Sequence, residues 1–157
     1  MPKIIVDHRE KNSGIHKELA KRGLDVEIRQ LPIADFLLQS KGADNKEITI
    51  AIEKKTQSDF ISSIIDKRIL HQLIALKENY TTPLLVIEGS ENIYTIRNFH
   101  PNAIRGMLAA IAIDFQIPVI YTKGFRDTAS LIEVISKRLE RPPRNISLIK
   151  KRKPSRQ

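Results

Sequence analysis

Cysteine and tryptophan are both absent from this chain of 157 residues, and only 5% of its residues are aromatic. Without Cys there is no disulfide framework, no thiolate zinc ligand and no cysteine nucleophile. The few aromatic rings argue against recognition of single strands by base stacking. No apolar run approaches the roughly 20 residues of a membrane-spanning helix, and the first residues lack a signal-peptide pattern. We therefore expect an intracellular protein without a membrane partner.

Two further classes of binding site lack their motifs. The chain has no glycine-rich phosphate loop, so we expect no nucleotide cofactor. The chain has four histidines, His8, His16, His71 and His100. No two of them are separated by one or by three residues, the spacings that would suggest a shared metal ion. A histidine-based zinc site is therefore not expected.

The charge is strongly biased toward one sign. Lys and Arg number 27 against 18 Asp and Glu, which gives a formal net charge of +9. Such an excess favours a polyanionic partner, most often nucleic acid. Part of the excess lies at the C-terminus, where 150–153 read Lys-Lys-Arg-Lys after a Pro-Pro pair. We predict a compact domain over 1–141 and a disordered basic linker or tail over 142–157.

Hydrophobic periodicity predicts strands that alternate with helices. The expected strands cover 3–6, 24–31, 36–38, 48–55, 83–88 and 117–121. The first expected helix is capped by Asn12 or Ser13 and ends at about 22. A second helix begins at 56–59, which resembles a capping box. Further helices are expected over 69–80, 101–115 and 128–141. This pattern, with one antiparallel meander between 24 and 55, predicts a three-layer α/β/α sandwich with a central mixed sheet.

The segment 51–59, Ala-Ile-Glu-Lys-Lys-Thr-Gln-Ser-Asp, carries the strongest chemical signal. Glu53 and Lys55 are separated by one residue, so on a strand they share a face. Asp7 ends one predicted strand and Asp35 begins another, so these acids can converge with Glu53 at one edge of the sheet. Carboxylate oxygens suit Mg²⁺, and a nearby amine can orient a water or stabilise a phosphorane. The constellation favours metal-dependent phosphodiester hydrolysis.

Each of these residues also has a purely structural interpretation. Asp7 can cap the following turn, and Asp35 can be a turn residue after Pro32. Asp59 suits the first turn of a helix through its charge alone. Glu53 and Lys55 can form an exposed pair on one face of a strand.

Several blocks in order resemble the nuclease domain of the XPF family of structure-specific endonucleases, most of all the archaeal XPF and Hef nucleases. The family signature, Gly-Asp followed after a strand by Glu-Arg-Lys-x-x-x-Asp, is matched by Ala34-Asp35 and by 53–59. The other similar blocks are 6–10 (Val-Asp-His-Arg-Glu), 60–68 (Phe-Ile-Ser-Ser-Ile-Ile-Asp-Lys-Arg), 86–89 and 100–106. Lys54 replaces the family arginine, while Ala34 and Lys67 replace family glycines.

The resemblance implies a restriction-endonuclease-like fold and a site for Mg²⁺ or Mn²⁺. Asp35, Glu53 and the main-chain carbonyl of Lys54 would bind the metal, and Lys55 would position the water. Asp7 and Asp59 would complete the acidic catalytic cluster. The residues expected to contact DNA are Arg9, Lys54, Arg68 and Gln72.

The same resemblance implies partners and a location. It implies a substrate of branched DNA, such as 3′-flaps and forks, and a homodimer, in the cytoplasm or nucleoid. The helix from Pro101 would supply part of the dimer contact, although its apolar surface is equally typical of a buried core helix. Family members usually carry a tandem helix-hairpin-helix module after the nuclease. Nothing in this chain has that pattern, and the basic tail resembles the linker that leads to it.

Two competing functions stay open from sequence. One is a non-catalytic DNA-binding or scaffold subunit of the same family. Retention of the acidic cluster argues against it, because carboxylates buried together are costly unless a positive group offsets them. The other is a junction resolvase of the same fold, against which the blocks at 66–68 and 100–106 argue.

Overall fold

The computed structural model describes residues 1–42 and 44–140, so the predicted tail at 142–157 lies outside the described residues. The strands are β1 (Lys3–Asp7), β2 (Asp25–Arg29), β3 (Phe36–Lys41), β4 (Glu47–Thr56), β5 (Pro83–Glu88) and β6 (Val119–Thr122). The helices are the 3₁₀ helix η1 (His8–Ser13) and the α-helices α1 (Ile15–Lys21), α2 (Gln57–Ile65), α3 (Arg68–Asn79), α4 (Pro101–Ile113) and α5 (Phe125–Leu139). None of the described helices has the length and apolarity needed to cross a membrane.

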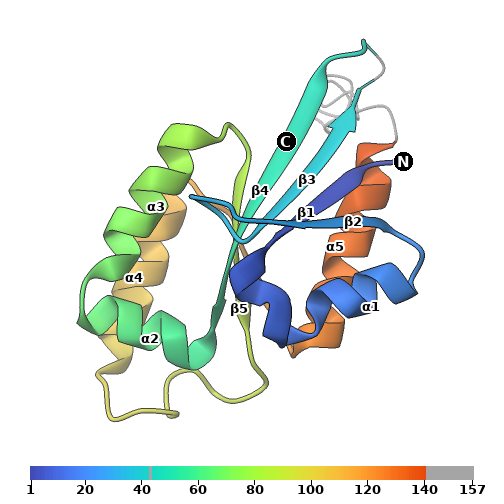
Figure 1. The fold of residues 1–157 in the computed structure, drawn as a ribbon. Coiled ribbons are helices and arrows are strands. Elements are labelled where there is room, and N and C mark those ends of the chain that lie inside the picture. The colour runs from blue at the N-terminus through green and yellow to red at the C-terminus, as the bar shows by residue number, and fades with distance from the viewer. Residues whose placement is uncertain (43, 141–157) are drawn as a thin grey trace, which may run out of the picture.

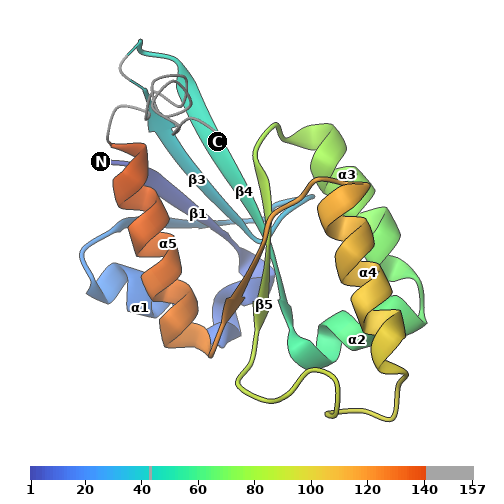
Figure 2. The ribbon, with the colours of Figure 1, turned by 180° about the vertical axis from the view of Figure 1, so that it is seen from behind.

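The six strands form one mixed sheet in the order β2-β1-β3-β4-β5-β6. β3 pairs antiparallel with both β1 and β4, whereas the β1–β2, β4–β5 and β5–β6 pairs are parallel. Helices α1 and α5 cover one face of the sheet, and α2, α3 and α4 cover the other (Figures 1 and 2). The predicted α/β/α sandwich with a mixed sheet is therefore confirmed.

The predicted antiparallel meander from 24 to 55 is wrong in its first strand. β2 pairs in parallel with β1, with Ile4 opposite Val26 and Val6 opposite Ile28. α1 lies between the two strands in sequence, and such a helical crossover returns the chain parallel to its start. The antiparallel part is confined to β3, which lies between β1 and β4.

The first helix also differs from its prediction. The segment after β1 is a 3₁₀ helix, and α1 begins only at Ile15, behind Gly14 with φ +84°. A Cβ at Gly14 would lie 3.3 Å from the Phe125 ring of α5. Both the left-handed backbone and this close approach favour glycine at this position. The helix therefore begins only after this glycine, and the 3₁₀ helix before it was not predicted.

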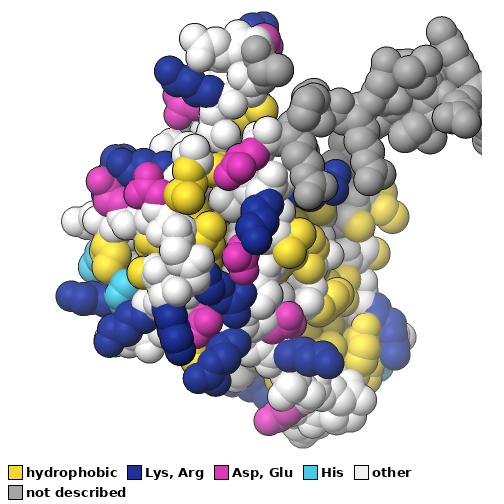
Figure 3. Space-filling view, turned by 90° about the vertical axis from the view of Figure 1, so that its right-hand side faces the viewer, with side chains coloured by type: hydrophobic (Ala, Val, Ile, Leu, Met, Phe, Trp, Pro, Cys, Tyr) yellow, Lys and Arg dark blue, Asp and Glu magenta, His cyan; other side chains and the backbone are white. Residues whose placement is uncertain are grey.

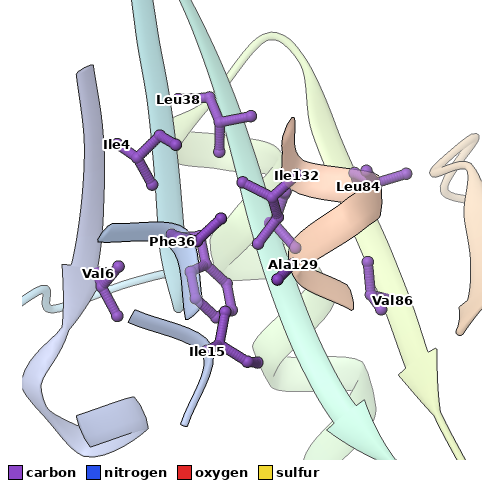
Figure 4. Packing of buried hydrophobic residues seen from close by; sticks show 11 residues of the cluster. Ile4, Val6, Ile15, Phe36, Leu38, Leu84, Val86, Ala129 and Ile132 are labelled. Carbon is purple, nitrogen blue, oxygen red and sulfur yellow. The ribbon is translucent and has the colours of Figure 1, made fainter. Parts of the chain in front are cut away.

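Three hydrophobic clusters flank the sheet and fix the direction of the side chains on β4. One core joins alternate residues of β1, β3, β4 and β5 to α1 and α5, with Phe36 fully buried at its centre (Figure 4). A second contains Phe60, Ile61 and Leu73 of α2 and α3, and a third joins Ala51 of β4 to Leu76 of α3. Ile52 belongs to the first core, so strict alternation directs Lys54 to the α1/α5 face and Glu53 and Lys55 to the α2/α3 face.

Candidate active site

Backbone hydrogen bonds align three acidic residues across neighbouring strands. The Asp7 N–H donates to the Asp35 carbonyl at 2.8 Å, and the Asp35 N–H donates to the Ile52 carbonyl at 2.8 Å. The Lys54 N–H in turn donates to the Asp35 carboxylate at 2.8 Å. Asp35 therefore lies between the end of β1 and the β4 segment that carries Glu53. The sequence predicted this convergence, and the sheet order explains it.

Asp35 and Glu53 form a partly buried carboxylate pair. Burial and the neighbouring Asp35 charge raise the pKa of Glu53 to about 8. Burial also raises the pKa of Asp35, although the Lys54 N–H opposes this shift. Two carboxylates that repel in a poorly hydrated site favour a bound proton or a cation between them. The pair is therefore suited to hold a positive ion.

Lys55 supplies the fixed positive charge beside this pair. Its side chain is on the same face as Glu53 and only 6% of the residue is exposed. Its charge acts to lower the pKa of Glu53, of Asp35 and, across the site, of Asp66. The turn between α2 and α3 therefore lies within electrostatic reach of Lys55.

Asp7 is fully buried, and its oxygens are occupied by protein donors. Oδ1 accepts from the Leu31 N–H at 2.7 Å, while Oδ2 accepts from the Arg9 N–H at 3.2 Å and pairs with the Arg9 guanidinium. Burial alone would raise the pKa of Asp7, but the Leu31 and Arg9 donors lower it overall. Asp7 thus caps η1, as its structural interpretation predicted, and also holds Arg9 beside the carboxylate pair. Asp35 and Glu53 both contribute to the raised pKa of Arg9, after the larger effect of Asp7.

The remaining predicted residues lie around this centre in different environments. Asp59 is exposed in the first turn of α2, where its N–H donates to the Thr56 cap at 3.1 Å. Arg68 begins α3 and pairs with Asp66, Nε to Oδ2, at 2.6 Å. Gln72 lies one helical turn further on, and its Oε1 is buried without a hydrogen-bond partner among the described residues. DNA contacts by Arg68 and Gln72 stay predictions.

The Lys54 ammonium lies on the opposite side of the sheet from Glu53 and Lys55. Its Nζ is 3.0 Å from Glu10 Oε1 and 3.7 Å from Glu88 Oε1, and its side chain is 8% exposed. A phosphate contact would require the ammonium to leave both carboxylates. The DNA contact of Lys54 stays a prediction.

The donor set fits a hard divalent cation. Within 1–42 and 44–140, no cluster of three or more His, Cys, Asp or Glu side chains is placed to bind a metal. Asp35 and Glu53 would thus supply two carboxylate ligands, and water, phosphate or the predicted Lys54 carbonyl would supply the others. Mg²⁺ commonly binds proteins through one or two carboxylates and keeps several waters. The raised pKa values of the pair show why a cation would be favoured there.

The family of the chain follows from a domain comparison. The family model of the ERCC4 domain matches residues 6–135. The chain belongs to the ERCC4-domain family. A similar relative is the 3′-flap repair endonuclease Xpf of Saccharolobus solfataricus, 32% identical over 88% of this chain and 56% of that protein. Another, from Methanocaldococcus jannaschii and provisionally named an ATP-dependent RNA helicase, is 38% identical over 87% of this chain and 15% of that protein.

Solved structures extend the likeness to three dimensions. XPF from Aeropyrum pernix in complex with DNA is 31% identical, with a TM-score of 0.72 over 87% of this chain and 64% of that one. A second structure of XPF from the same organism is 29% identical in sequence and has a TM-score of 0.76. This match covers 88% of this chain and 62% of that one. The XPF resemblance and the restriction-endonuclease-like fold are confirmed. The ERCC4 domain described here spans less than two thirds of the length of each of these relatives and solved chains.

Sequence reasoning missed the partners of Lys54 in this ERCC4 domain. Glu10 is in the block at 6–10 and Glu88 ends β5, but neither received a role. Their approach to Lys54 depends on η1 and β5 lying on either side of β4, which no local spacing reveals. The period of two along β4 was an available signal, since it separates Lys54 from its neighbours.

Lys67 adopts a left-handed backbone, and we expect its replacement by Gly to stabilise the ERCC4 domain. Its φ is +66°, a conformation that costs a residue with a side chain about 1 kcal/mol, and the side chain is exposed. Lys67→Gly should raise the free energy of unfolding by about 0.5–1 kcal/mol, measured by urea denaturation. Lys17→Gly, at an exposed helical site in α1, is the matched control and should lower it by about 1 kcal/mol. A loss of stability in Lys67→Gly would contradict the strain.

Proposed function

We propose that this chain is a metal-dependent, structure-specific DNA endonuclease that cuts branched DNA such as 3′-flaps and forks. The observation that carries the proposal is the partly buried Asp35–Glu53 pair with the buried Lys55 on the same face as Glu53. A non-catalytic scaffold would have little physical reason to keep two adjacent, partly buried carboxylates whose pKa values are raised. The branched-DNA substrate is supported by the family and by the names of its relatives. Such a substrate would place the protein in the cytoplasm or nucleoid.

The residues of the chain suggest a division of work. Mg²⁺ or Mn²⁺, when bound by Asp35 and Glu53, would supply Lewis-acid stabilisation of the phosphate charge. Lys55 is positioned to orient the attacking water and to offset charge that develops on the phosphate. Arg9 keeps an exposed guanidinium beside the pair and is suited to bind a neighbouring phosphate. Asp7 holds Arg9 in this orientation.

The test is cleavage of labelled 3′-flap, fork and plain duplex DNA with Mg²⁺, Mn²⁺ or a chelator. We expect metal-dependent cutting of the flap and the fork, and its loss in Asp35→Asn. Asp114→Asn, at an exposed helix end remote in sequence from the site, is the matched control and should cut like the parent. Binding without cutting under every metal would favour the scaffold function. Absence of both would refute DNA as the substrate.

We further propose that the chain forms a homodimer through α4 and β6. β6 is an edge strand, and the small residues Ala103, Gly106 and Ala109 of α4 are exposed rather than buried. Ile113 is 72% and Tyr121 54% exposed, beside a hollow of about 450 Å³ between the end of α4 and β6. Figure 3 looks onto the side of the molecule where α1 and α5 lie, on which charges of both signs are mixed, so the surface of α4 faces away in this view. An apolar patch beside an open strand edge suits a second copy of the chain.

Charge on this surface should dissociate the dimer. Tyr121→Glu or Ile113→Glu is expected to raise the dimer dissociation constant by roughly 30-fold or more, measured by sedimentation equilibrium. Ile74→Glu, on the exposed side of α3 and 42% exposed in the parent, is the matched control and should leave the constant unchanged. A parent that sediments as a monomer over the whole concentration range would refute the dimer.

A further inference from the structure

A chain of buried polar contacts lies beneath the candidate site, on the α1/α5 side of the sheet. Lys54 is its centre, between Glu10 of η1 and Glu88 of β5. Glu88 also accepts a hydrogen bond from the Thr128 hydroxyl of α5, which lies 2.7 Å from the Thr122 hydroxyl of β6. Glu10 and Glu88 each have 12% of the side chain exposed, and Thr128 is fully buried. The contacts thus join η1, three strands and α5.

Lys54 is directly between the two residues of β4 that serve the site. Because side chains alternate along a strand, any twist or shift that carries Lys54 out of its pocket also turns Glu53 and Lys55 away from Asp35. Glu10 adds a second constraint, since it neighbours Arg9 in η1. Arg9 is held on one side of η1 by Asp7, and Glu10 is held on the other by Lys54. One ammonium therefore fixes both segments that carry the charged groups of the site.

We propose that Lys54 is a positioning residue of the proposed endonuclease, which clamps β4 and η1 from behind the site and does not contact DNA. The inference rests on the proposed function and changes the role of one residue in it. The family arginine at this position fits the same role, because a guanidinium can bind two carboxylates at once. Burial is the reason that the clamp is effective, since a long cation in water gains little from such pairs.

The test compares Lys54→Met with Lys54→Arg in kcat, in DNA affinity and in the salt dependence of that affinity. We expect kcat to fall by about 10- to 100-fold in Lys54→Met and to recover in Lys54→Arg. The dissociation constant for fork DNA in chelator, and its slope against salt, should match the parent. A phosphate contact would instead lower the slope by roughly 0.9. Lys46→Met, in the exposed connection between β3 and β4, controls for the loss of one charge.

Glu88→Gln keeps the test decisive if Lys54→Met fails to fold. A positioning role predicts a lower kcat with unchanged affinity. A DNA-binding Lys54 freed from Glu88 would bind DNA more tightly and with a steeper salt slope, which would overturn the proposal. The rise in Tm on adding Mn²⁺ measures the positioning of the metal-binding residues without any cleavage. This rise should be smaller in Glu88→Gln than in the parent. An equal rise would also count against the clamp. A parent that neither binds nor cuts DNA would refute the proposed function, while the Mn²⁺ comparison would still decide the clamp.

Discussion

Lys55→Met is expected to lower the rate of phosphodiester cleavage by about 100- to 1,000-fold while leaving DNA affinity nearly unchanged. The residue is 6% exposed and faces the Asp35–Glu53 pair, so its ammonium can reach a phosphate only at the reacting position. A preorganised charge in such a site acts mainly on the transition state, and the loss of one such donor has an effect of this size. Methionine preserves most of the buried stem, so the change reports the charge rather than a cavity.

Single-turnover cleavage of a fork at saturating enzyme measures the rate, and fluorescence anisotropy in chelator measures the dissociation constant. Lys123→Met, at an exposed position after β6, is the control for a lost charge and should retain the parent rate. If the affinity of Lys55→Met falls as much as its rate, Lys55 is a phosphate contact that binds substrate and transition state equally.

Glu53→Gln should stabilise the metal-free protein at neutral and alkaline pH. The pKa of Glu53 is about 8 in the folded chain and has an ordinary value of 4.5. Between these values the folded protein keeps a proton that the unfolded chain releases, so stability falls as pH rises. Each pH unit within this window removes up to about 1.4 kcal/mol. Glutamine cannot ionise, and its amide can still donate to Asp35, so the variant should be about 2–4 kcal/mol more stable at pH 8.

Urea denaturation of the parent and of Glu53→Gln at pH 5 and pH 8, in chelator, measures this difference. The two proteins should be close in stability at pH 5 and separate at pH 8. Mn²⁺ should then stabilise the parent much more than the variant, because the cation offsets the same repulsion that the substitution removes. Glu47→Gln, exposed at the start of β4, is the matched control and should follow the parent at both pH values. A parallel pH dependence of parent and Glu53→Gln would contradict the raised pKa.

Some features of this fold are encoded by local sequence patterns, and others depend on the topology of the whole sheet. Alternation in 48–55 was sufficient to place Glu53 and Lys55 on one face, and the apolar run at 83–88 was sufficient to predict β5. The parallel direction of β2 could not be predicted from its alternation, because the pattern is the same for a parallel and an antiparallel strand. Only the crossover through α1 decides the direction. The pocket of Lys54 was inaccessible for a similar reason: Glu10 and Glu88 are 44 and 34 residues away in sequence and meet it only through the sheet order. Local signals thus predicted the elements and the residues at strand ends, whereas the direction of β2 and the partners of Lys54 depended on the topology.

The separation between the site and the β6 edge has an evolutionary consequence. Asp35, Glu53 and Lys55 come from β4 and the residue before β3, while β6 is two strands further along the sheet. Every group of the candidate centre therefore belongs to one polypeptide, and a dimer joined at β6 would contain two independent centres. After gene duplication, one copy could lose its acidic residues and still serve as a binding partner, since the other copy would keep a complete centre. The architecture therefore permits the descent of an asymmetric pair, one subunit catalytic and one not, from a symmetric ancestor.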